Sequence, residues 1–204
     1  MMRPKLQVLS ILLGLAVLAA GCVTVGPEGK GGEASRTASF SYTWQDTNLA
    51  IVVDVELARR RAEEPYFPLG IKIANKRLNR IIVDRETLLL VDEANAVYPM
   101  PSVEELSLQY DKLVPDNKFK SQTGVLGDQI MTGFSYFRKA EGRLFPQTQG
   151  GGRTVDSIYV QTKGYMEDLV YFPMPAGGIK GKTLRLRLNV YELGKPLDVA
   201  FRVD

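Results

Sequence analysis

Apolar residues recur at every second position through much of the chain, a period typical of β-strands. Successive side chains of a strand point to opposite faces of its sheet, so a half-buried strand alternates apolar and polar residues. The clearest example is 184–190, where leucines alternate with Arg185 and Arg187. The same alternation, or short runs rich in leucine and β-branched residues, predicts further strands over 40–44, 49–57, 69–74, 81–83, 87–91, 165–172 and 197–203.

Turn-forming residues separate these runs, and one helix interrupts them. Several short strands at this spacing favour an all-β fold, an antiparallel β-sandwich. Ser102 and Glu105 match the capping-box pattern that begins a helix, and apolar residues follow at near-helical spacing until Pro115, which is expected to end it. The prediction is therefore one sandwich domain over 40–204 with a short helical insertion.

The first 22 residues have the order of an export signal. Two basic residues precede an apolar stretch over 6–20, and small residues then lead to Cys22, the one cysteine of the chain. The apolar stretch is shorter than the roughly 20 residues that a membrane-spanning helix needs. The segment 18–22 resembles the lipobox of bacterial lipoproteins, with Ala19 where that family usually has leucine.

This resemblance implies that residues 1–21 are a signal peptide and that Cys22 carries the attached lipid. Val23 follows the cysteine where an aspartate would favour retention at the inner membrane, so the outer membrane is favoured, with the domain facing the periplasm or the exterior. Residues 22–39 are rich in glycine, have no apolar period, and are predicted to be a flexible tether. The alternative is an ordinary cleaved signal with an incidental cysteine.

The remainder of the chain is similar to a loose group of lipoproteins of unknown function that carry an immunoglobulin-like β-sandwich. The similar stretches are 66–75, 88–92 with Tyr98 and Pro99, and 168–173. The cysteine pair of antibody domains is absent, so the resemblance concerns architecture. A shared fold does not supply a function.

Composition argues against several classes of function. The chain has no histidine, which removes the commonest general base and the commonest metal ligand. A single cysteine allows neither an intramolecular disulfide nor a thiolate metal cluster. Loss of Arg3 and Lys5 with the signal peptide lowers the formal charge from +3 to +1. This charge is too small to indicate a nucleic-acid-binding domain, which is usually strongly basic. We therefore expect no metal, no cofactor and no nucleic-acid partner.

Several local patterns could carry chemistry, and each also has a structural explanation. The segment 176–183 fits the phosphate-loop pattern with alanine first, but strand-like alternation follows it where that motif needs a helix. We interpret it as a glycine-rich hairpin and expect no nucleotide. Adjacent carboxylates on a strand face opposite ways, which favours solvated surface charge over a glycosidase pair for Glu63–Glu64, Glu104–Glu105, Glu167–Asp168 and Asp92–Glu93. Turn formation is favoured over calcium binding for Asp92–Asn95 and Asp116–Asn117.

Basic and aromatic clusters leave two explanations open. The basic residues of 59–61 and 76–80 either contact acidic lipid headgroups or keep strand ends soluble, and the second is favoured. Six aromatic residues either form a stacking surface or fill the core, again with the second favoured: Phe134, Tyr136, Phe137, Tyr159, Tyr165 and Tyr171. The decisive question is whether the less regular region 116–153 lines a concave surface.

These patterns predict a lipid-anchored envelope lipoprotein with a non-catalytic binding or structural domain. Its partners would be the membrane, through the lipid on Cys22, and an envelope protein or glycan. An accessory lipoprotein of a secretion or envelope-assembly machine is the second hypothesis. A hydrolase that uses carboxylates or a serine is the third.

Overall fold

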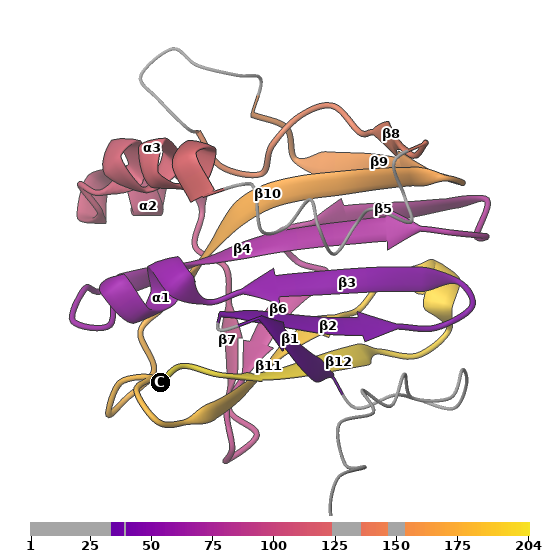
Figure 1. The fold of residues 1–204 in the computed structure, drawn as a ribbon. Coiled ribbons are helices and arrows are strands. Elements are labelled where there is room, and N and C mark those ends of the chain that lie inside the picture. The colour runs from indigo at the N-terminus through magenta and orange to yellow at the C-terminus, as the bar shows by residue number, and fades with distance from the viewer. Residues whose placement is uncertain (1–33, 39, 124–135, 147–153) are drawn as a thin grey trace, which may run out of the picture.

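The computed structural model describes residues 34–38, 40–123, 136–146 and 154–204. Cys22 and the predicted signal peptide lie outside these residues. Strands are the main regular elements of the described chain, and the helices are few and short, so the all-β prediction is confirmed (Figure 1). Within the described ranges no helix is long and apolar enough to cross a membrane.

The largest sheet has six strands in the order β1-β2-β3-β4-β10-β8. Neighbouring strands are antiparallel, except that β8 runs parallel to β10. The two longest strands, β4 and β10, pair over their whole lengths, with Tyr66 opposite Pro173 and Asn75 opposite Gly164. The strand bounds are β1 Ser35–Ala38, β2 Ser41–Gln45, β3 Leu49–Asp54, β4 Tyr66–Asn75, β8 Arg138–Lys139 and β10 Gly164–Pro173.

A second sheet of four strands lies behind the first in the order β12-β11-β6-β7 (Figure 1). Its strands are β6 Leu88–Val91, β7 Val97–Pro99, β11 Thr183–Leu188 and β12 Leu197–Arg202. A separate pair joins β5 Arg80–Asp84 to β9 Ser157–Gln161, and the 3-10 turn η2 spans Tyr191–Leu193. One hydrophobic cluster takes side chains from both larger sheets, including Val53, Ile71, Val170, Leu90, Leu186 and Phe201.

Strand β11 confirms the alternation that defined it. The side chains of Leu184, Leu186 and Leu188 are buried in the shared cluster, whereas Arg185 and Arg187 point to the opposite face. The preceding segment 176–183 leads into this strand, as predicted, and not into a helix. The prediction of a hairpin was wrong, because the segment connects β10 of one sheet to β11 of the other.

The helical insertion is larger than predicted. It consists of α2, Val103–Gln109, and α3, Leu113–Thr123. The hydroxyl of Ser102 accepts the backbone N–H of Glu105 at 3.0 Å, which confirms the predicted start of α2. The prediction that Pro115 ends the helix was wrong. Pro115 lies in the first turn of α3, where its missing N–H would have had no intrahelical partner.

Two predicted boundaries near the N-terminus also differ from the structure. The strand predicted over 49–57 ends at Asp54, and the short helix α1, Glu56–Arg60, follows it. The carboxylate of Asp54 accepts the N–H of Glu56 at 3.0 Å and so turns the chain out of the sheet. Strand β1 begins at Ser35, inside the range 22–39 that was expected to be tether.

Candidate functional site

A pocket lies between the six-stranded sheet and the helices α1 and α3. The strand register places Val52, Lys72 and Glu167 side by side across β3, β4 and β10, with Gly70 in the next row. Leu57 of α1 and Phe119 and Lys120 of α3 complete the walls around a hollow of about 60 Å³. A Cβ atom on Gly70 would lie 3.2 Å from the Cβ of Asp54, so glycine suits the close packing of this floor.

Three lysines converge on one carboxylate at this pocket. The carboxylate of Glu167 lies 3.3 Å from the Nζ of Lys139, 3.7 Å from that of Lys120 and 3.8 Å from that of Lys72. The exposed fraction of the side chain is 9% for Lys72, 18% for Lys120, 19% for Glu167 and 50% for Lys139. The cluster is therefore closed on the side of the sheet and open on the side of Lys139.

Burial and mutual attraction set the protonation of this cluster. Burial lowers the pKa of Lys120 to about 8, although the nearby carboxylates of Glu167 and Asp168 act in the opposite direction. Burial alone would raise the pKa of Glu167, but the lysines outweigh it and hold that pKa below its ordinary value. Near neutral pH the ammonium group of Lys120 and the carboxylate of Glu167 are therefore both charged.

A second acidic group closes the pocket on the side of β2. The hydroxyl of Ser41 donates to the carboxylate of Asp54 at 3.1 Å, and burial raises the pKa of Asp54. In the described part of the chain, the charged side chains at this site are therefore Lys72, Lys120, Lys139, Glu167 and Asp54. Among the described residues no three His, Cys, Asp or Glu side chains gather as a metal site.

A separate groove lies between α1 and α3, next to this pocket. Leu57 and Phe119 line both hollows, and Pro115 lies further along the groove, which has a volume of about 450 Å³. Arg60 pairs with Glu56 at 2.9 Å and lies 4.3 Å above the ring of Phe119. The groove therefore has an apolar floor beneath a basic rim.

The three arginines of the basic cluster 59–61 each make different contacts. The cluster lies on and just after α1 and not at a strand end, which corrects the predicted location. Arg59 stacks on Phe40 at 4.3 Å, whereas Arg61 binds the buried carboxylate of Asp116 at 2.8 Å. In the second cluster, Lys76 donates to the carbonyl of Asp46 at 2.6 Å.

The carboxylates Glu167 and Asp168 point to opposite faces of β10, as predicted for neighbours on a strand. The prediction that both are solvated was wrong. Asp168 is only 1% exposed, and its carboxylate accepts the N–H groups of Leu144 at 2.7 Å and Leu169 at 2.9 Å. Burial raises the pKa of Asp168 to about 6 in spite of these bonds. Asp168 therefore holds the segment around Leu144 against the edge of the sheet.

Asp116 also has a structural role, and its prediction as a turn residue was wrong because it lies in α3. Its buried carboxylate accepts the hydroxyl of Tyr110 at 2.6 Å in addition to the guanidinium of Arg61. Burial raises the pKa of Tyr110, so its hydroxyl stays protonated and donates. The ring of Tyr171 packs against Tyr110 at 5.6 Å, which completes a buried cluster that anchors α2 and α3 to the sheet.

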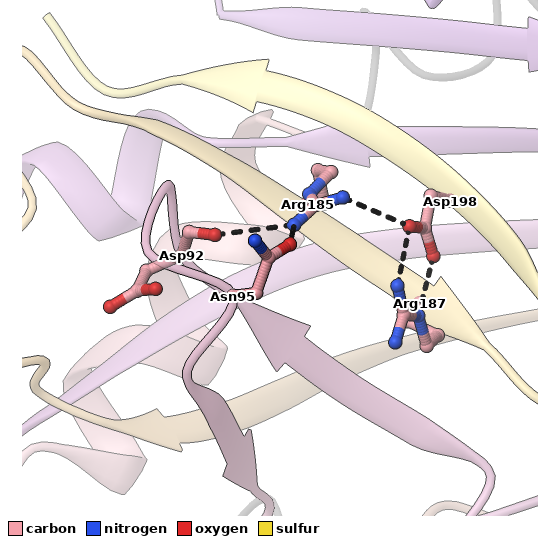
Figure 2. Close-up of polar contacts among 5 residues, drawn as sticks. All are labelled: Asp92, Asn95, Arg185, Arg187 and Asp198. Carbon is pink, nitrogen blue, oxygen red and sulfur yellow. Dashed lines mark hydrogen bonds and ion pairs between the residues drawn. The ribbon is translucent and has the colours of Figure 1, made fainter.

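The predicted turn at Asp92–Asn95 is confirmed, and it joins a polar network on the outer face of the second sheet (Figure 2). Arg185 donates to the side chain of Asn95 at 2.7 Å and to the carbonyl of Asp92 at 3.3 Å. Arg187 makes two hydrogen bonds to Asp198, at 2.7 and 2.8 Å. Both arginines are therefore engaged in pairing within this sheet and the turn beside it.

The aromatic residues do not gather on one surface. Tyr171 and Phe137 are buried, Tyr136 and Tyr159 are exposed, and Tyr165 is half-buried. Phe134 lies outside the described residues. The described start of the region 116–153 does line a concave surface, through Phe119 and Lys120.

Comparisons with protein families, with curated proteins and with solved structures return no match for this chain. The site must therefore be interpreted from its own geometry. The period-two pattern does not point to Lys72 or Lys120, the two most buried cations of the pocket. The only local signal is the pair Gly70 and Lys72, which interrupts an otherwise apolar strand.

Proposed function

We propose that this chain is a lipid-anchored, non-catalytic binding protein of the bacterial cell envelope. The lipobox-like segment that ends at Cys22 supports the anchor. The convergence of Lys72, Lys120 and Lys139 on Glu167, beside an apolar hollow, carries the binding role. Charged groups held at a concave, partly apolar surface are the common features of a ligand site.

The anchor restricts where the domain can act. Ser35, the first residue of β1, follows Cys22 by 13 residues, so even a fully extended connection spans at most about 45 Å. The domain stays close to the membrane, and confinement raises the effective concentration of neighbouring components. Weak contacts with an envelope protein or glycan are then sufficient. We place the anchor at the outer membrane, with the domain facing the periplasm or the exterior.

We also propose that the two larger sheets form a β-sandwich of the immunoglobulin-like kind. Their shared hydrophobic cluster supports a two-layer arrangement. Strands β1 to β4 are neighbours in chain order and so form a simple meander. This part of the chain differs from immunoglobulin-like sandwiches, whose strands have Greek-key connections.

The anchor is tested by Cys22→Ser in the full chain. We expect the wild-type protein to fractionate with membranes and to incorporate a clickable palmitate, and the variant to lose both properties. Thr24→Ala, two residues away, is the matched control and should retain both. A Cys22→Ser protein that stays in membranes with its lipid label intact would refute the anchor.

The binding role is tested by photo-crosslinking in intact cells. A photoreactive amino acid replaces Lys139 at the open side of the pocket or, as the control, Lys195, an exposed residue between η2 and β12. We expect an envelope protein or glycan to be crosslinked from position 139 and not from position 195. Equal recovery from both positions, or none from position 139, counts against the proposal.

A further inference from the structure

The side chain of Lys120 brings a primary amine to a small, partly apolar hollow. Lys120 lies on α3 and lines the pocket, to which Val52, Leu57 and Leu169 contribute apolar surface. Its side chain is 18% exposed, and its Nζ lies 3.7 Å from the carboxylate of Glu167. At this separation the two groups attract each other without forming a short hydrogen bond. The hollow of about 60 Å³ beside them has room for a group of a few atoms.

The surroundings of Lys120 make its amine easier to deprotonate than that of an ordinary lysine. Burial is the main cause, and it lowers the pKa of Lys120 to about 8. The charges of Arg143 and Lys139 act in the same direction, whereas those of Glu167 and Asp168 oppose it. At pH 7 the neutral amine is roughly 300-fold more abundant than in a lysine with the ordinary pKa of 10.5. A lysine desolvated in an apolar pocket is an activated nucleophile, because only the neutral amine has a free lone pair.

The charge next to Lys120 favours one class of electrophile. Condensation with an aldehyde gives a protonated imine, which keeps a positive charge beside the carboxylate of Glu167. Reaction with carbon dioxide would give a carbamate, whose negative charge would be repelled by that carboxylate, and acylation would leave an uncharged amide. The aldehyde product therefore retains the ion pair that the other two products lose.

We propose that Lys120 is a covalent site for small aliphatic aldehydes. The lone pair of Nζ forms a bond to the carbonyl carbon, the carbonyl π pair moves to oxygen, and a proton passes from nitrogen to that oxygen. Loss of water from this carbinolamine leaves the imine, whose protonated form pairs with Glu167. Overall, the ammonium group and the aldehyde give the protonated imine and one water, with no oxidant or reductant. The alkyl group lies in the hollow against Val52 and Leu169. This covalent site goes beyond the binding role proposed above and does not depend on it.

The test traps the imine in the purified full chain at pH 7. Propanal is added with cyanoborohydride, which reduces the protonated imine to a stable propyl amine, and peptide mass spectrometry gives the labelling rate of each lysine. Exposed Lys195 is the matched control within the same molecule. We expect Lys120 to be labelled at least tenfold faster than Lys195, because partial burial offsets only part of its gain in neutral amine. Equal rates, or faster labelling of Lys195, overturn the proposal.

Two further measurements assign the preference to the folded pocket. In guanidinium chloride, which unfolds the chain, the rates at Lys120 and Lys195 should agree within about twofold. With naphthaldehyde, which is too large for a hollow of about 60 Å³, the preference for Lys120 should fall at least tenfold. A preference that survives unfolding or the larger aldehyde overturns the proposal. If crosslinking from position 139 recovers an envelope partner while Lys120 is not labelled preferentially, the binding role stands and the aldehyde site is wrong.

Discussion

Lys120 makes the stability of this protein depend on pH in an unusual direction. A lysine that simply gains an ion pair stabilises the folded state below its pKa, and that stability is lost as the pH rises. Lys120 differs because its side chain is 18% exposed and burial disfavours its ammonium more than Glu167 favours it. Its pKa is lowered to about 8 from the ordinary 10.5. Deprotonation of Lys120 should therefore stabilise the fold.

The magnitude follows from proton linkage. Between pH 8 and 10.5 the unfolded chain holds a proton that folded Lys120 has released, so the free energy of unfolding increases with pH. The linkage relation gives an increase of about 2 kcal/mol between pH 7 and pH 9.5. Other titrating groups also contribute, and the difference between the wild-type protein and Lys120→Met isolates this residue. Methionine keeps most of the side-chain volume and does not titrate.

The single tryptophan provides the assay. Trp44 is buried in β2, so its fluorescence follows urea unfolding of the sheet. Unfolding curves at pH 7, 8, 9 and 9.5 give the free energy for each variant, and the series stops below the ionisation of tyrosines in the unfolded chain. We expect the wild-type profile to rise relative to that of Lys120→Met, while Lys195→Met follows the wild type. Parallel profiles for the wild type and Lys120→Met would refute the reasoning.

Two further predictions concern buried carboxylates. Burial raises the pKa of Asp168 from 3.8 to about 6, so the folded chain holds this proton to higher pH than the unfolded chain. The free energy of unfolding should fall by about 2 kcal/mol from pH 4 to pH 7 in the wild type relative to Asp168→Asn; urea titrations that show no such difference would contradict this. Tyr110→Phe removes the hydroxyl that donates to buried Asp116 and should cost about 1–3 kcal/mol, measured by the urea midpoint. Exposed Tyr136→Phe is the control, and equal midpoints for the two variants would contradict the role of that bond.

Local patterns predicted the strands that keep one face in the core. The leucines of β11 are buried and its arginines are half-buried and paired with Asp198, so period-two alternation was a sufficient signal. The role of Ser102 as the residue that caps α2 was equally predictable, because capping depends only on residues within one helical turn. The run 49–57 was predicted as one strand, although β3 ends at Asp54. Strand β3 is buried on both faces, and the apolar residues of the following segment continue its period into α1.

Local patterns could not predict the pocket that contains Lys72, Lys120 and Glu167, because these side chains are buried by tertiary contacts. Lys72 and Glu167 have the spacing of residues that face solvent from a strand. They become enclosed because α3 covers that face of the sheet, and the sequence of α3 does not state where it packs. The buried cluster of Tyr110, Asp116 and Arg61 has the same origin. Polar residues brought together from distant segments give no local signal.

The pairing of β4 with β10 has a consequence for how the chain reaches this structure. Asn75 pairs with Gly164 and Tyr66 with Pro173, so these two neighbouring strands come from segments far apart in the sequence. Contacts of such long sequence separation form slowly, because a large loop must close before they are made. A nascent chain that lacks residues 164–173 leaves one side of β4 unpaired, and the sheet stops after β1 to β4. The six-stranded sheet is therefore complete only after Pro173 has been synthesised.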